Sequence, residues 1–141
     1  MKYKFLPHTA DVKFIAYGKN ESELIENAAL AMFSTITHIK DIKNNEKKYM
    51  VKKSFSAVSI DELIWKILQH TLSFADSKNL FCYNLNVLNL SKKNTYKAVV
   101  KLFLIDKSEI YANRDVKGIS KYSFIFKHNK KRLSITAVLD V

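Results

Sequence analysis

The sequence predicts an α+β fold in which two amphipathic helices pack on a curled, largely antiparallel sheet, in the order ββαβαββββ. Two segments repeat apolar residues at helical spacing behind a capping motif, and seven others are rich in β-branched and aromatic residues. Short polar loops join the strands of the second half, which favours antiparallel pairing. Because no repeat or linker interrupts the 141 residues, we expect one domain over residues 1–141.

The strands are expected where β-branched and aromatic residues concentrate. These segments span residues 2–6, 12–17, 48–57, 80–90, 96–105, 116–127 and 132–140. The loops at 91–94 and 128–130 are short enough for hairpins. The stretch rich in lysine and asparagine at 40–48 is the segment that we expect to be most mobile.

Each predicted helix begins with a capping box. Asn20 is followed three residues later by Glu23, and Ser59 by Glu62. One apolar stripe follows each cap, so we expect each helix to pack on one side only. The stripes consist of Leu24, Ile25, Ala28, Met32, Thr35 and Ile36 in the first helix, and Leu63, Ile64, Ile67, Leu68, Thr71, Leu72 and Ala75 in the second.

Basic residues outnumber acidic ones, which gives a formal net charge of +11 at pH 7. Such a charge is typical of nucleic-acid-binding proteins, because lysines that neutralise phosphates release counterions. The charge comes from 22 lysines and only two arginines, however, and the basic runs are spread along the chain. Lysine lacks the planar fork of arginine. We therefore favour a solvated basic surface and keep a basic RNA-binding or chaperone-like module as the alternative function.

The sequence contains no signal for a membrane or a disulfide. No apolar run reaches the roughly eighteen residues of a membrane span, so we expect a cytoplasmic protein without a membrane partner. The single cysteine, Cys82, can form neither an internal disulfide nor a thiolate zinc cage, and we interpret it as a packed residue.

Common catalytic motifs are also missing. The four histidines are scattered, no Gly-x-Ser-x-Gly elbow occurs, and two glycines cannot form a glycine-rich phosphate loop. These observations give no support to a zinc protease, a serine hydrolase or a nucleotide-binding enzyme. A metal-dependent hydrolase with Asp11 and Asp140 as ligands remains a less favoured alternative, because no base or nucleophile is evident.

Both ends of the chain place an aspartate beside a predicted strand. Asp11 lies in the turn PHTADV before the second strand, and Asp140 ends the last strand just before Val141. Carboxylate oxygens, together with the α-carboxylate of Val141, suit Ca²⁺, Mg²⁺ or Mn²⁺ if the two strands are close. Two simpler interpretations stay open: Asp11 bonds its own backbone, or Asp140 is a solvated carboxylate at a frayed end.

Two stretches carry a longer pattern. Residues 3–37 read YKFLPHTADVKFIAYGKNESELIENAALAMFSTIT, and residues 138–141 read VLDV. They resemble the archease family, which opens with Tyr-x-Phe-Leu-x-His-Thr-Ala-Asp-Val, continues with Glu-Asn-Ala-Ala-x-Ala-Met-Phe, and closes with Val-Leu-Asp-Val. The order of elements between them also fits that family.

This resemblance implies an accessory protein rather than a ligase. Such a protein would promote the GTP-dependent guanylylation and turnover of an RtcB-type RNA ligase in tRNA splicing and RNA repair, and would meet tRNA or other RNA through that ligase. The resemblance also implies a divalent cation, calcium first, held by Asp11, Asp140 and Val141. Lys117 and His8 are possible contacts to phosphate or to the partner.

The chain departs from the family pattern at three positions. Tyr122 stands where relatives carry a histidine, and Lys66 and His70 stand where they carry an aspartate and a glutamate. We therefore expect a less acidic surface than that of relatives, with an altered partner contact or activity.

Overall fold

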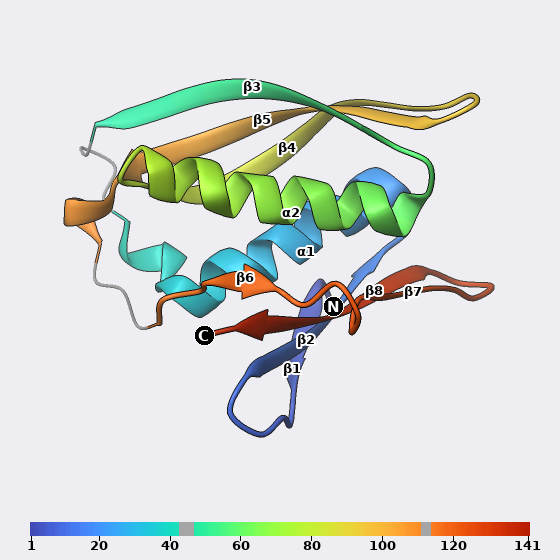
Figure 1. Cartoon of the computed structure of the whole chain (residues 1–141), viewed down its shortest axis with the longest axis horizontal. Helices are drawn as coiled ribbons and strands as arrows, with labels where there is room; N and C mark the ends of the chain where they lie inside the picture. Colours follow the sequence, from blue (N-terminus) through green and yellow to red (C-terminus); the bar gives the residue numbers. More distant parts are fainter. Residues whose placement is uncertain (43–46, 111–113) are drawn as a thin grey trace.

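The computed structural model describes residues 1–42, 47–110 and 114–141. Its two α-helices and mostly antiparallel strands confirm the predicted α+β class (Figure 1). The helices are α1 (Glu21–Ile36) and α2 (Ile60–Ser77), with short 3₁₀ turns at Ile39–Asp41 and Lys107–Glu109. The strands are β1 (Tyr3–Leu6), β2 (Val12–Gly18), β3 (Lys48–Ala57), β4 (Leu80–Lys92), β5 (Tyr96–Asp106), β6 (Gly118–Ile119), β7 (Ile125–His128) and β8 (Leu133–Asp140).

The strands form two sheets rather than one curled sheet. The five-stranded sheet has the order β1-β2-β8-β6, with β7 also paired to β8, and the three-stranded sheet has the order β3-β5-β4. All of these pairs are antiparallel. The last strands therefore do not form one meander, because the β4–β5 hairpin belongs to one sheet and the β7–β8 hairpin to the other.

Both helices lie between the two sheets (Figure 1). The second helix, α2, follows the prediction residue for residue, since its seven stripe residues are all buried. The first helix, α1, was expected to pack on one side only, and that prediction is wrong. Ala29, Ala31 and Phe33 are buried as well, because α1 contacts β2 and β8 on one side and β4 on the other.

Polar contacts fix both helices in place. The Oδ1 atom of Asn20 accepts the N–H of Glu23 at 2.9 Å, and the Oγ atom of Ser59 accepts the N–H of Glu62 at 3.4 Å, as the capping boxes predict. The buried side chain of Asn27 donates to the carbonyl of Tyr17 at 2.7 Å, which ties α1 to β2.

The end of β2 runs directly into the start of α1. A Cβ atom on Gly18 would lie 2.4 Å from the main-chain nitrogen of Leu24, so this close approach requires glycine. One hydrophobic cluster fills the space between the layers, from Phe14 on β2 to Leu139 on β8.

The single strand predicted over 116–127 is divided in the structure. Strands β6 and β7 both pair with β8, and the N–H of Ser120 still donates to the carbonyl of Val138, but residues 121–124 leave the sheet in a turn in which Phe124 N–H donates to the carbonyl of Lys121. On the other edge of β6, side chains from α2 bond the main chain of Ile119. Part of the predicted mobile loop, residues 43–46, lies outside the described residues. No helix in the described ranges is long and apolar enough to cross a membrane.

Candidate metal and partner site

The predicted metal ligands lie at the adjoining ends of two neighbouring strands: Asp11 directly precedes β2, Asp140 ends β8, and Val141 follows it. The last pair of the β2–β8 register is Val12 with Leu139, and Asp11 and Asp140 are the next residues beyond that pair. Opposed residues of antiparallel strands have Cα atoms about 4.5–5.5 Å apart and point to the same face. The two aspartates thus start from adjacent backbone positions, although they come from opposite ends of the sequence.

A strained turn presents Asp11. Ala10 has a φ of 70°, and the N–H of Asp11 donates to the carbonyl of Thr9 at 2.9 Å across it. A bond between residues two apart around a positive φ defines the rare γ-turn. Positive φ is costly for a residue with a Cβ, and such strain is concentrated at functional sites. The turn therefore differs from an ordinary strand connection.

Lys117 lies directly beside Asp140. Its main-chain N–H donates to the carbonyl of Asp140 at 2.7 Å, and the next residue, Gly118, pairs with Asp140 in the sheet. Figure 1 shows this end of β8 alongside the start of β6, with the C-terminal residue next to it. Asp140 and Lys117 are exposed, and Asp11 and Val141 are half-buried, so all four are within reach of solvent or a partner.

The oxygen donors fit a hard cation in kind but not in number. Asp11, Asp140 and a main-chain oxygen of Val141 are all oxygen ligands, as Ca²⁺ and Mg²⁺ prefer. Calcium takes about six to eight such ligands. Across the described ranges, no three His, Cys, Asp or Glu side chains gather where they could hold a metal. Two aspartates at this edge would therefore need water or oxygens from a partner to complete a site.

A shallow hollow adjoins Asp11. It has a volume of about 410 Å³, and Phe5, Lys13 and Arg114 contribute to its lining. Arg114, one of the two arginines, is held there by a main-chain bond from its N–H to the carbonyl of Ile36 at 3.5 Å. Arg114 belongs to no sequence motif, and no sequence pattern links it to the first turn, so its place beside Asp11 could not be predicted.

His8 lies in the same turn as Asp11 but is exposed and three residues away. The structure thus gathers Asp11, Asp140, Val141 and Lys117 at one end of the β2–β8 pair, with His8 at its margin. Among the described residues of this edge, none forms a nucleophile oriented by a base.

The three departures from the family pattern lie elsewhere. Lys66 donates to the carbonyl of Ser56 at 3.0 Å, and the ring of His70 packs edge-on against Phe55, so both bind α2 to β3. Tyr122 is fully exposed in the turn between β6 and β7. Lys66 and His70 therefore have structural partners on β3.

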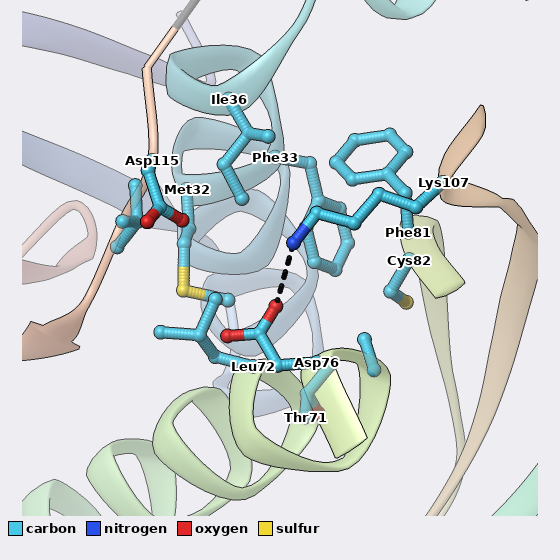
Figure 2. A pocket seen from close by; sticks show the side chains of 12 residues that line it. Met32, Phe33, Ile36, Thr71, Leu72, Asp76, Phe81, Cys82, Lys107 and Asp115 are labelled. Atoms are coloured by element: carbon cyan, nitrogen blue, oxygen red, sulfur yellow. Dashed lines mark hydrogen bonds and ion pairs between the residues drawn. The ribbon is translucent and has the colours of Figure 1, made fainter. Parts of the chain in front are cut away.

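A second cavity lies between α1, α2 and β4 (Figure 2). It is lined mainly by apolar side chains such as Met32 and Leu72, and the ion pair of Lys107 with Asp76 at 3.4 Å lies at its rim. Its free space of about 20 Å³ is room for one water molecule. Cys82 also lines this cavity, and burial raises the pKa of its thiol to about 12, so it is the packed, unreactive residue that the sequence predicts.

Comparison with known sequences gives a match over almost the whole chain. Residues 3–141 match the archease protein family (MTH1598/TM1083). A protein archease from Methanosarcina barkeri is 31% identical over 109 residues, which cover 77% of this chain and 73% of that protein. A protein archease from Sulfolobus acidocaldarius is 27% identical over 144 aligned residues, which cover 99% of this chain and 99% of that protein.

Solved structures show the same fold. Protein 1598 of Methanobacterium thermoautotrophicum superimposes with a TM-score of 0.82 at 21% identity, over 99% of each chain. An archease from Thermotoga maritima, described as a possible chaperone, gives a TM-score of 0.58 at 16% identity, over 98% of this chain and 96% of that one. The paired chain ends, the fold and the match over residues 3–141 agree: the chain belongs to the archease family.

Proposed function

We propose that this protein is an accessory factor of an RtcB-type RNA ligase, and that it promotes GTP-dependent guanylylation and turnover of the ligase during tRNA splicing and RNA repair. The observation that supports this most is the β2–β8 register, because its last pair, Val12 with Leu139, lies directly beside the aspartate of HTADV on one chain segment and the aspartate of VLDV on the other. Both motifs belong to the pattern by which the chain resembles archeases. Two distant motifs that meet at one solvent-accessible edge favour a shared task for their side chains.

In this proposal Asp11, Asp140 and Val141 would hold a divalent cation, most simply Ca²⁺, with Mg²⁺ or Mn²⁺ as alternatives. The cation would supply positive charge that attracts oxygen ligands of the partner, since the described carboxylates leave its coordination incomplete. The chain's own residues have simpler tasks. The γ-turn at Ala10 orients Asp11, and the N–H of Lys117 fixes the main chain of Asp140.

Lys117 and His8 would contact the partner or a phosphate group beside this edge. The side chain of Lys117 is exposed next to Asp140, and a lysine binds phosphate as a point charge. The ligase would carry out the chemistry, because the described residues around Asp11 and Asp140 include no evident nucleophile with its base.

The proposal is tested by mixing the protein with the RtcB-type ligase of the same genome and following the formation of guanylylated ligase and of joined RNA. We expect faster guanylylation and many turnovers per ligase with the protein, and little of either without it. Asp11→Asn and Asp140→Asn should each remove most of the stimulation. The control variant Asp61→Asn removes the same single negative charge, but at the exposed start of α2, and should leave the stimulation of the ligase intact.

Two results would contradict the proposal. The first is a ligase whose rate does not change at any ratio of the two proteins. The second is RNA cleavage by the purified protein alone that requires a divalent metal and disappears in Asp11→Ala, because this would identify a hydrolase. Calcium titration of wild type and Asp140→Asn by calorimetry tests the cation separately: heat that persists unchanged in the variant would exclude Asp140 as a ligand.

A further inference from the structure

The three-stranded sheet has one face on the helices and one face turned away from them (Figure 1). Along β3 the burial alternates strictly, so that every second residue from Lys48 to Ser56 is exposed. In β5 the residues between the outward ones, such as Val100 and Leu102, are fully buried against the helices. We call the set of outward residues on β3, β4 and β5 the outer sheet face.

Four lysines and no acidic residue occupy the outward positions of β3 and β5. Lys48 and Lys52 come from β3, and Lys97 and Lys101 from the central strand β5. On β3 and β5 the outward neighbours of these lysines are apolar or hydroxyl residues, and on β4 the exposed Asn86 is the register partner of Lys101. The positive charge of the chain, which the sequence spreads over many short runs, is therefore unbalanced on this face.

Lys52 and Lys101 face each other directly. They are register partners in the β3–β5 pair, so their side chains leave the sheet side by side. Like charges in opposed positions destabilise a sheet. Within the described chain neither ammonium forms an ion pair, so an anion from outside the chain would offset this repulsion.

Aromatic rings lie among the lysines. Tyr83 and Phe103 form a ring pair with centroids 6.3 Å apart and planes at 50°. The ammonium of Lys48 lies 5.7 Å from the Tyr83 ring, and that of Lys101 lies 5.4 Å from the Phe103 ring. Met50, the register partner of Phe103, is 62% exposed and extends the apolar platform. Rings and cations thus alternate over a short distance.

The other end of the same face offers polar groups. A hollow of about 400 Å³ lies there, and Ser54, Ser56, Asn89 and Lys97 contribute to its lining. Among the described residues, the side-chain amide of Asn89 has no hydrogen-bond partner. Amides and hydroxyls can bond base edges or a ribose 2′-hydroxyl.

We propose that the outer sheet face binds single-stranded RNA directly. Bases would stack on Tyr83 and Phe103, phosphates would lie between Lys52 and Lys101, and the strand would continue over the hollow beside Asn89. An exposed sheet with aromatics that stack bases, flanked by cations that follow the backbone, is a recurrent solution for single strands. The face lies on the three-stranded sheet, whereas the aspartates of the proposed ligase function lie at the edge of the five-stranded sheet.

The test uses the full chain and a fluorescent 12-nucleotide RNA without secondary structure, with binding followed by anisotropy at several salt concentrations. Replacing both rings, Tyr83→Leu with Phe103→Leu, should weaken binding at least about fivefold. The matched control Tyr122→Leu removes a fully exposed ring from another surface and should change nothing. Lys52→Gln with Lys101→Gln should lower the slope of log K against log salt by about 1.4, at about 0.7 for each phosphate contact.

A control with a second pair of lysines distinguishes binding at the outer sheet face from binding through the overall positive charge of the protein. Lys127→Gln with Lys130→Gln removes the same charge from exposed positions at the β7–β8 hairpin and should have a smaller effect. The proposal would be overturned if both lysine pairs caused equal losses of RNA affinity, or if duplex RNA bound more tightly than single-stranded RNA. It would also be overturned if an acidic peptide with the same charge as the RNA displaced it. Because Lys52→Gln with Lys101→Gln relieves a repulsion, this variant should be at least as heat-stable as wild type. Ligase stimulation is a separate readout, so either proposal can fail alone.

Discussion

The Oε1 atom of Gln69 on α2 accepts a hydrogen bond from the main-chain N–H of Ile119 on β6 at 3.0 Å. The indole N–H of Trp65, one turn earlier on α2, donates to the carbonyl of the same residue, also at 3.0 Å. Ile119 faces β8 on one edge and α2 on the other, so two side chains take the place of a neighbouring strand. This pair of bonds holds β6, and with it Lys117, against the end of β8.

Gln69→Leu should lower the free energy of unfolding by about 1–3 kcal/mol, because the N–H of buried Ile119 would lose its acceptor. Urea denaturation followed by circular dichroism measures the change. Gln69→Glu keeps an acceptor in the same place and should retain most of the stability. If both variants unfold like wild type, the bond contributes nothing and β6 is held by β8 alone.

Ala10→Gly tests whether the γ-turn serves Asp11. Glycine adopts positive φ without strain, so stability should stay equal or rise by up to about 1 kcal/mol. Stimulation of the ligase should fall nevertheless, because Asp11 would be held less firmly. Ala10→Val should destabilise the protein, since a β-branched side chain is poorly tolerated at this φ. Full stimulation by Ala10→Gly would argue that the strain has no functional role.

Thr71→Val should stabilise the protein by about 1 kcal/mol. The hydroxyl of Thr71 is fully buried and has no hydrogen-bond partner in the described part of the chain, so valine would remove an unsatisfied polar group at similar volume. Thermal and urea unfolding provide the measurement. A loss of stability instead would show that the hydroxyl bonds a water molecule in the adjoining cavity of about 20 Å³.

Cys82 predicts how stability responds to alkaline pH. Burial raises the pKa of its thiol from 9.0 to about 12, so the folded protein holds a proton that the unfolded chain loses above pH 9. The contribution of this group is therefore intact below pH 9 and falls as the pH rises towards 12. Cys82→Ala should show a shallower loss of stability than wild type across this alkaline range, measured by urea unfolding at each pH.

The same burial should protect the thiol from chemistry. At mildly alkaline pH a thiol reagent should label Cys82 only as fast as the protein opens, and at the normal thiol rate in urea. Fast labelling of the folded protein would contradict the buried position between β4 and the helices.

The sequence predicted α2 better than α1 for a physical reason. A helix that packs on one side shows its buried face as a stripe, and each stripe residue of α2 is buried. The first helix lies between two sheets, and its second buried face is made partly of Ala29 and Ala31, which periodicity does not distinguish from tolerated surface alanines. The division of the strands into two sheets could not be predicted either, because the composition of a strand does not show which other strand it pairs with.

The candidate site, like the fold, could be predicted from the sequence only in part. Asp11 and Asp140 were recognisable because each sits at the boundary of a predicted strand, and the structure makes those strands neighbours. The γ-turn, Arg114 and the side-chain bonds to Ile119 depend on local geometry or on contacts between distant segments. The outer sheet face could have been noticed from the alternation in β3, whose exposed residues share one side. Cation binding at the aspartates stays a prediction.

The pairing of β2 with β8 also sets the order in which the two sheets can form during synthesis. On the ribosome β1 and β2 emerge before the other strands, yet β2 lacks its second neighbour until residues 133–140 have left the exit tunnel. The three-stranded sheet, by contrast, is made from a continuous stretch between β3 and β5 and can pair earlier. The edge that carries Asp11 and Asp140 can therefore form only after the three-stranded sheet has been synthesised, because it requires residues 133–140.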